Sequence, residues 1–228
     1  MYPIAFALDH ESENRNRLTT FFRSIVSIPW QIVAYIWGIA AGVVTFIAWF
    51  ALLFTGRYPQ GMYDFNAKYL RMITRVNGFH LLGTDGWPPF HGDPDDAYAL
   101  RVGIAPPKEE YSRMKVLFRI IVGIPVYFLA LIQGLIAFVI AVVAWFAILF
   151  TGRFSEGLYN PLRAALAYNT RASAYFLLMT EDYPPFSYDE AVEQPQLASG
   201  SGPGIGAPAP QEEERPPEPP PGPPPGQP

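Results

Sequence analysis

The sequence has no cysteine, only three histidines and few charged residues, which make up 16% of the chain. Without cysteine, neither a disulfide framework nor a thiolate-ligated metal site is possible. The histidines, His10, His80 and His91, show none of the short helical spacings of a metal-binding pair. The formal net charge of −4 is small and spread along the chain, so it gives no electrostatic argument for nucleic acid. We expect no metal, no cofactor and no nucleic-acid partner.

Sequence motifs for catalysis are missing as well. The chain contains no serine nucleophile elbow, phosphate-binding loop or HExxH helix. The acidic cluster at residues 93–96 lacks the alternating oxygen ligands and the distal acid of a calcium-binding loop, so we interpret it as a solvated linker. We therefore predict that the protein is not an enzyme.

Charge is absent from two long stretches, residues 25–54 and 120–150, which are rich in aliphatic and aromatic residues. A membrane-crossing helix needs about 20 predominantly apolar residues, and each stretch exceeds that length. The alternative, a buried helix of a soluble protein, is less favoured because the chain has too few polar residues to cover two such blocks. We predict a mainly α-helical integral membrane protein. Its first block should serve as the insertion signal, because the preceding residues do not resemble a cleavable signal sequence.

The two apolar blocks belong to a tandem repeat. Adding 96 to a residue number gives its counterpart without a gap from position 17 to position 93 of the first copy. AWFALLFTGRYPQGMY at residues 48–63 thus returns as AWFAILFTGRFSEGLY at residues 144–159. The register holds through the polar segments, which chance similarity between apolar runs does not explain. We predict two membrane repeat units, residues 1–97 and 98–193, and a proline-rich tail, residues 194–228.

Each unit has the same predicted order of elements. An alternating stretch (residues 2–9 and 98–104) indicates a short strand, and the apolar block and an amphipathic segment follow. In the first unit Phe65, Tyr69 and Val76 share one helical face, while Lys68 and Arg71 share another. This pattern suits an interfacial helix at the lipid headgroups, and equally a helix packed on the strands.

The path of each apolar block has two interpretations. A single span is long for the bilayer, because thirty helical residues measure about 45 Å against a hydrocarbon core of about 30 Å. A hairpin turning near Gly38–Gly42 or Gly134 would put all sixteen Lys and Arg residues on one side, as the positive-inside rule favours. It would also keep both copies in one orientation, so that their strands can pair. We favour hairpins and keep the single span as the alternative.

The end of each apolar block carries a Thr-Gly-Arg stop. Gly56 and Gly152 suit a helix C-cap with positive φ. The following arginines should meet the last helical carbonyls and lipid phosphates. We predict headgroup or partner contacts for the repeat-matched charges Arg23, Arg57, Arg75, Asp85, Arg119, Arg153, Arg171 and Glu181. Convergence of Arg23, Arg75 and Asp85 in one polar pocket, or of their counterparts, would instead favour an enzyme.

The tail is dominated by proline and glycine and ends in PPEPPPGPPPGQP. Such a segment cannot bury enough apolar surface to offset the entropy of ordering it, so we expect disorder with polyproline II character. A polyproline-binding partner is the functional alternative to a solubilising spacer.

The segments FFRSIVSIPW, AWFALLFTGRYPQGMYDF and LLGTDGWPPF together resemble the domain-of-unknown-function 4389 family of bacterial membrane proteins. The second copy, with FRIIVGIP, AWFAILFTGRF and LLMTEDYPPF, is closer still at its end. The first copy departs at Gly86-Trp87, where the family pattern has a charged residue and Tyr. The resemblance covers residues 4–190 and implies a multi-pass protein of the bacterial inner (cytoplasmic) membrane, with no catalytic residues to carry over.

These observations lead to three functional hypotheses. The first is a non-enzymatic accessory or scaffolding component of a bacterial cell-envelope complex, with membrane lipids and a membrane-protein complex as partners. The second is lipid binding or passive translocation in a groove between the two units. The third is a membrane enzyme.

Overall fold

The computed structural model describes residues 2–11, 13 and 15–186, and the predicted tail lies outside these residues. Its elements are β1 (Ile4–Leu8), α1 (Arg17–Val26), α2 (Ile28–Thr55), α3 (Gln60–His80), β2 (Leu100–Ile104), α4 (Arg113–Leu117), α5 (Arg119–Val122), α6 (Ile124–Thr151) and α7 (Glu156–Phe176). The same order of strand, short helix, long helix and amphipathic helix occurs twice. The mainly helical fold with a small two-stranded sheet is therefore as predicted.

Most of each apolar block lies in one continuous helix of 28 residues, so the preferred hairpin is wrong. Proline occupies the first turn of both helices, where its missing N–H costs no hydrogen bond. Both helices end as predicted, at Gly56 and Gly152 with φ of 71° and 72°. Gly38 serves packing instead of a turn, because a Cβ atom there would lie 2.9 Å from the hydroxyl oxygen of Tyr69 on α3.

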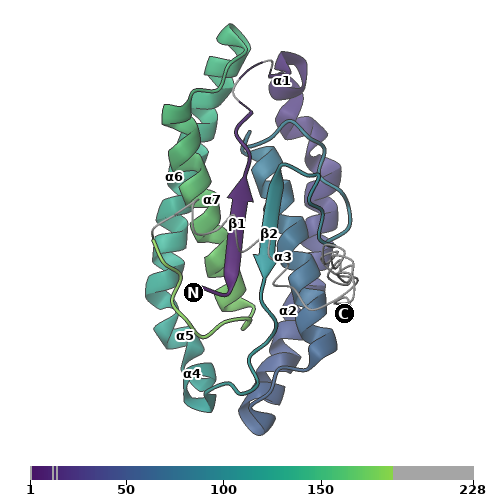
Figure 1. Cartoon of the computed structure of the whole chain (residues 1–228), viewed down its shortest axis with the longest axis vertical. Coiled ribbons are helices and arrows are strands. Elements are labelled where there is room, and N and C mark those ends of the chain that lie inside the picture. The colour runs from purple at the N-terminus through teal and green to yellow at the C-terminus, as the bar shows by residue number, and fades with distance from the viewer. Residues whose placement is uncertain (1, 12, 14, 187–228) are drawn as a thin grey trace, which may run out of the picture.

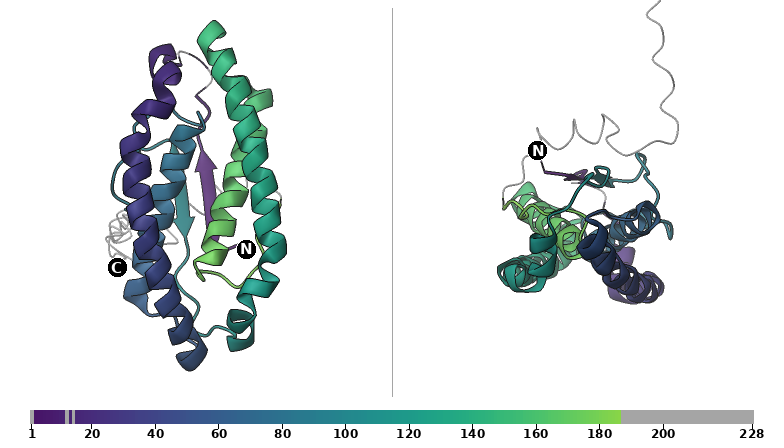
Figure 2. Two further views of the ribbon diagram at one scale, coloured as in Figure 1. Left: turned by 180° about the vertical axis from the view of Figure 1, so that it is seen from behind. Right: turned by 90° about the horizontal axis from the view of Figure 1, so that it is seen from below.

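The two long helices run antiparallel along one side of the molecule (Figure 1). Helices α3 and α7 form a second layer, and the ribbon of β1 and β2 lies on the far side of that layer (Figure 2). The second unit is therefore inverted relative to the first, contrary to the expected common orientation. The strands pair nevertheless, as an antiparallel ribbon that matches Ile4 with Ile104 and Leu8 with Leu100.

The two units exchange their strands. β1 of the first unit packs on α7 of the second, and β2 packs on α3. Near the middle of this arrangement the hydroxyl oxygens of the matched residues Thr74 and Thr170 lie 3.4 Å apart. One hydrophobic core cluster contains side chains from both units. The amphipathic helix α3 is thus packed between α2 and the ribbon, which is the second of the two placements considered for this segment.

Candidate functional site: an apolar face and its groove

The large apolar side chains of α2 and α6 point away from the protein. On both helices they recur every three or four residues, so they form one stripe along each helix. The exposed, repeat-matched pairs are Ile28/Ile124, Ile32/Phe128, Ile36/Ile132, Ile39/Leu135, Val43/Val139, Phe46/Val142, Phe50/Phe146 and Phe54/Phe150. We call these sixteen side chains the apolar face.

The opposite side of α2 carries small residues. Ala34, Ala41 and Ala48 are at most 2% exposed. Ala137, Ala141 and Ala144 are buried on α6. A helix that packs in a water-soluble protein places its large apolar residues inside and leaves the periphery polar. The distribution here is the reverse, with the large apolar side chains of both long helices on the outer surface.

By length and composition, two helical stretches, Arg17–Thr55 and Arg119–Thr151, are long and apolar enough to cross a membrane. Core helices of soluble proteins and signal sequences also meet that criterion. The outward orientation of the apolar side chains therefore distinguishes these helices better than their length does. Most of each stretch is not buried in the protein.

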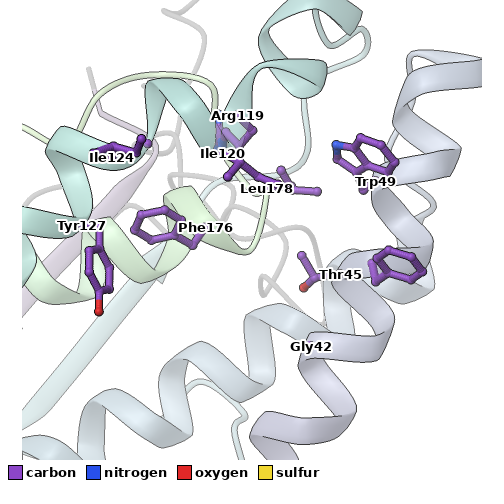
Figure 3. Close-up of a pocket in the computed structure, with 11 residues that line it drawn as sticks. Gly42, Thr45, Trp49, Arg119, Ile120, Ile124, Tyr127, Phe176 and Leu178 are labelled. Carbon is purple, nitrogen blue, oxygen red and sulfur yellow. The ribbon is translucent and has the colours of Figure 1, made fainter.

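A groove of about 530 Å³ opens between α2 and the start of α6 (Figure 3). Its lining comes from three segments: Gly42, Thr45, Phe46 and Trp49 of α2, Arg119, Ile120, Gly123, Ile124 and Tyr127 around α5 and α6, and Phe176 and Leu178 at the end of α7. Because Phe46 and Ile124 also belong to the apolar face, the groove is continuous with that face. An apolar chain is the ligand type that such a lining accommodates.

The repeat-matched arginines Arg23 and Arg119 are buried. They lie on the short helices α1 and α5, and each donates hydrogen bonds to carbonyls at and just after the end of the amphipathic helix. Arg23 Nη1 donates to the carbonyl oxygens of Phe79 and Thr84, at 3.2 and 2.9 Å. Arg119 makes the corresponding contacts with the carbonyls of Tyr175 and Thr180.

The turns that present these carbonyls contain a second matched feature. Leu82 and Leu178 have positive φ, 65° and 62°, in a region that residues with a Cβ rarely occupy. The chain therefore holds an unfavourable backbone conformation at the same place in both units. The carbonyls of Thr84 and Thr180 follow directly, within reach of the arginines.

The acids matched between the units share one backbone contact, because Asp85 Oδ2 accepts from the Asn16 N–H at 2.9 Å as Glu181 does from the matched Ser112, but their ion pairs differ. Asp85 pairs with Arg23 at 2.5 Å and with Arg15 at 3.0 Å. Glu181 accepts a hydrogen bond from the Ser112 N–H at 2.6 Å and lies 3.6 Å from Lys108 Nζ. Within the described residues, no carboxylate lies within ion-pair distance of Arg119. The expected grouping of arginine and acid thus occurs in the first unit only.

Arg75 and Arg171 are buried on the ribbon side of the amphipathic helices. Their guanidinium carbons lie 5.7 Å from the ring of Tyr98 and 5.9 Å from the ring of Tyr2. Each arginine therefore contacts a tyrosine of the other unit. Within the described part of the chain, Arg75 forms no ion pair with Asp85, so these charges do not form the joint polar site that would favour an enzyme.

Of the eight predicted contact residues, Arg57 and Arg153 are solvent-exposed. Their backbone N–H groups donate to Thr55 Oγ1 and Thr151 Oγ1, both at 3.1 Å. Arg153 approaches Glu13 to 3.9 Å. Both arginines follow the ends of the long helices, so they stand beside the apolar face.

The repeated Thr-Gly-Arg segment is also the joint between the units, which the sequence alone does not reveal. The Tyr111 N–H donates to the Gly56 carbonyl at 2.8 Å, and the Arg15 N–H donates to the Gly152 carbonyl at 3.2 Å. About two turns earlier, the indole N–H of Trp49 donates to the Val116 carbonyl at 3.0 Å. The indole N–H of the matched Trp145 reaches Thr20 of the first unit.

No group of three or more His, Asp or Glu side chains that could hold a metal ion occurs among the described residues. His80 is instead hydrogen-bonded to Ser27 Oγ at 3.0 Å. Burial and the nearby Arg23 lower the pKa of this imidazole below its usual value, so it is neutral at pH 7.

The family model for a domain of unknown function (DUF4389) matches the chain twice, at residues 17–91 and 113–187. The two matched segments correspond to the two repeats and together span more than half of the chain. No curated protein and no solved structure matches it significantly.

Proposed function

The chain belongs to the DUF4389 family in two tandem copies, and we propose that it is a non-enzymatic membrane protein that scaffolds or assists a larger assembly. The apolar face is held in lipid, and the opposite side of the molecule is presented to water and to partner proteins. The observation that carries this proposal is the matched set of sixteen outward-pointing apolar side chains on α2 and α6.

The size of the apolar face supports stable membrane attachment. Complete burial of one large apolar side chain is worth about 1.5–3 kcal/mol. Sixteen half-exposed side chains therefore supply on the order of 10 kcal/mol when lipid covers them. A single myristoyl chain gives only a weak, reversible attachment with an association constant of about 10⁴ M⁻¹. The apolar face exceeds that threshold without any covalent anchor.

Fractionation of cells that express the full chain tests the membrane part of the proposal. We expect the protein in the membrane pellet after washes with high salt and with alkaline carbonate, and its release by detergent. Recovery as a soluble monomer without detergent would overturn the proposal.

A matched pair of variants assigns this behaviour to the apolar face. Ile39→Asp combined with Leu135→Asp adds two charges to the face, and we expect the membrane-bound fraction to fall several-fold. Asn77→Asp combined with Asn160→Asp adds the same charge at exposed positions on α3 and α7. This control should remain membrane-bound.

The scaffolding role and the bacterial inner membrane as its location rest on the family resemblance and on the large polar side opposite the apolar face. Affinity purification of the full chain in mild detergent tests that role. We expect a membrane-protein partner to co-purify in a defined ratio. A solitary, stable monomer would contradict the scaffold.

Lipid binding is the second candidate function, and the groove between α2 and α6 favours it. Its apolar lining and its continuity with the apolar face suit one acyl chain. Native mass spectrometry should detect one lipid bound to the wild-type chain. In Gly42→Trp the indole side chain should fill part of the groove, so the lipid should be lost. Equal retention by both would exclude this site.

A further inference from the structure

We propose that α2 and α6 lie parallel to the membrane plane within a single leaflet and do not cross the bilayer. This inference rests on the membrane association proposed above and adds its geometry. The partner surface is one face of a lipid bilayer, and the whole polar side of the protein then faces one aqueous compartment. Three observations lead to this orientation.

The first observation is the position of an exposed ion pair along the long helix. Asn66 Nδ2 of α3 donates to Thr45 Oγ1 of α2 at 2.9 Å. The rings of Tyr69 and Trp37 are 6.4 Å apart. Residues 66–69 of α3 are therefore level with residues 37–45 of α2, which include the middle of that helix.

Lys68 lies in this window and pairs with Asp93 at 2.8 Å, with 50% and 51% of the two side chains exposed. If α2 crossed a bilayer, this solvated pair would sit near the centre of the hydrocarbon. A charged group there costs about 2.5–3.5 kcal/mol even on the most permissive scale. With α2 in the membrane plane, the same pair stays in water.

The second observation is the placement of the β-ribbon. Arg71 Nε donates to the Val102 carbonyl at 3.2 Å, and the Tyr63 hydroxyl donates to the Ala105 carbonyl at 2.6 Å. The ribbon thus runs beside α3, level with the middle of the long helices.

Among the described residues the sheet contains two strands, so each strand has one edge without a strand partner. Open sheet edges do not occur in contact with lipid, because their backbone groups find no hydrogen-bond partner there. A crossing orientation would carry the ribbon, and the Arg101–Asp9 ion pair at its end, into the thickness of the membrane. The in-plane orientation leaves both on the water side, since the ribbon is the layer farthest from α2 and α6 (Figure 2).

The third observation is the length of the apolar surface. The short helices before α2 and α6 extend the apolar face with further exposed matched pairs, Leu18/Met114, Phe21/Leu117 and Ile25/Ile121. The first helical stretch has 39 residues. At about 1.5 Å per residue it measures nearly 60 Å, twice the hydrocarbon thickness of about 30 Å. A helix that lies in the plane has no such limit.

The in-plane orientation also accounts for the distribution of cations. Arg57 and Arg153 lie at opposite ends of the molecule because the second unit is inverted. They face the same compartment only if neither long helix crosses. All flanking lysines and arginines of the described chain then share one aqueous side, without any hairpin.

Single cysteines in this cysteine-free chain test the orientation in sealed inside-out and right-side-out membrane vesicles. Gln60→Cys and Glu156→Cys are exposed, repeat-matched positions next to opposite ends of the long helices. Lys68→Cys reports the middle of the polar side, and Ile39→Cys reports the middle of the apolar face. A membrane-impermeant maleimide is applied to each vesicle type, and labelling after detergent denaturation gives the total thiol.

We expect the cysteines at positions 60, 68 and 156 to react from the same side. Position 68 should react about tenfold or more faster than position 39, because lipid covers only the latter. Reaction of positions 60 and 156 from opposite sides would overturn the in-plane orientation and leave the membrane proposal intact. Protection of position 68 to the level of position 39 would do the same. Rapid labelling of position 39 in a protein found outside the membrane fraction would overturn both proposals.

Discussion

The matched buried arginines of the two repeats, Arg23 and Arg119, have different hydrogen-bond and ion-pair partners. In the first, Arg23 reaches two carbonyls and also a carboxylate, Asp85, which it shares with Arg15. In the second, Arg119 reaches the two matched carbonyls, and Glu181 turns to Lys108 instead. The carbonyl contacts are common to both units, so they belong to the fold. The ion pair between Arg23 and Asp85 is an addition of the first unit.

Substitution of the matched acids, Asp85 and Glu181, should give the largest difference in stability between the repeats. Asp85→Asn removes the carboxylate that pairs with buried Arg23 and one of the two that pair with buried Arg15, which should cost about 3 kcal/mol of unfolding free energy. Glu181→Gln removes a contact with a half-exposed lysine, so its cost should stay below about 1 kcal/mol. Thermal unfolding of both variants in one detergent measures this difference. Equal losses would show that Arg119 also depends on its matched acid.

Substitutions at positions that have the same conformation in both repeats should lower stability equally. Gly56 and Gly152 have φ of 71° and 72°, where alanine is strained. Gly56→Ala and Gly152→Ala should each lower the unfolding free energy by about 1–2 kcal/mol, because a Cβ atom disfavours this conformation. The unfolding midpoints of the two variants should agree. A loss confined to one repeat would mean that the two joints are not equivalent.

Local sequence signals predict the parts that recur in both units. The alternating stretches predicted β1 and β2, and the uncharged blocks predicted α2 and α6. Gly56 and Gly152 predicted where α2 and α6 end. The hairpin failed because the glycines at the expected turns, Gly38, Gly42 and Gly134, lie inside continuous helices. A glycine such as Gly38 also serves helix packing as readily as a turn, and the sequence does not distinguish the two uses.

The contacts between distant segments could not be predicted from local patterns. The strand exchange brings Arg75 to Tyr98 and Arg171 to Tyr2, across the boundary between the units. Charged residues were expected at the headgroups, yet Arg23 and Arg119 are buried, because carbonyls left open after α3 and α7 accept their hydrogen bonds. The groove is lined by α2, by the start of α6 and by the end of α7, an arrangement that no single segment encodes.

A smaller difference between the repeats concerns pH. His80 has Phe176 as its counterpart, and the folded state holds the pKa of His80 below its usual value of 6.5. Because the unfolded chain binds the proton more readily, stability should fall as the pH drops below about 6.5. His80→Phe makes the first repeat like the second in this respect, and it should lessen the fall in melting temperature between pH 7 and pH 5 by about 2 °C. An unchanged pH profile would rule out His80 as the group responsible.

The smallest effect is expected at the exposed pair of Lys68 and Asp93. A hydrogen bond from Lys68 holds the pKa of Asp93 below its usual value. Exposed ion pairs contribute little, so Lys68→Ala should change the unfolding free energy by less than about 1 kcal/mol. Its membrane-bound fraction should equal that of the wild-type protein. Clearly tighter membrane insertion of Lys68→Ala would indicate that the lysine sits in hydrocarbon.

Helix orientation in the bilayer is the most direct test, because the four long helices α2, α3, α6 and α7 run nearly parallel to one another (Figure 1). Polarised infrared spectroscopy of the full chain in oriented bilayers measures the tilt of these helices as a group. We predict amide I dichroism for helix axes near the membrane plane. Dichroism for axes near the membrane normal would contradict the in-plane apolar face.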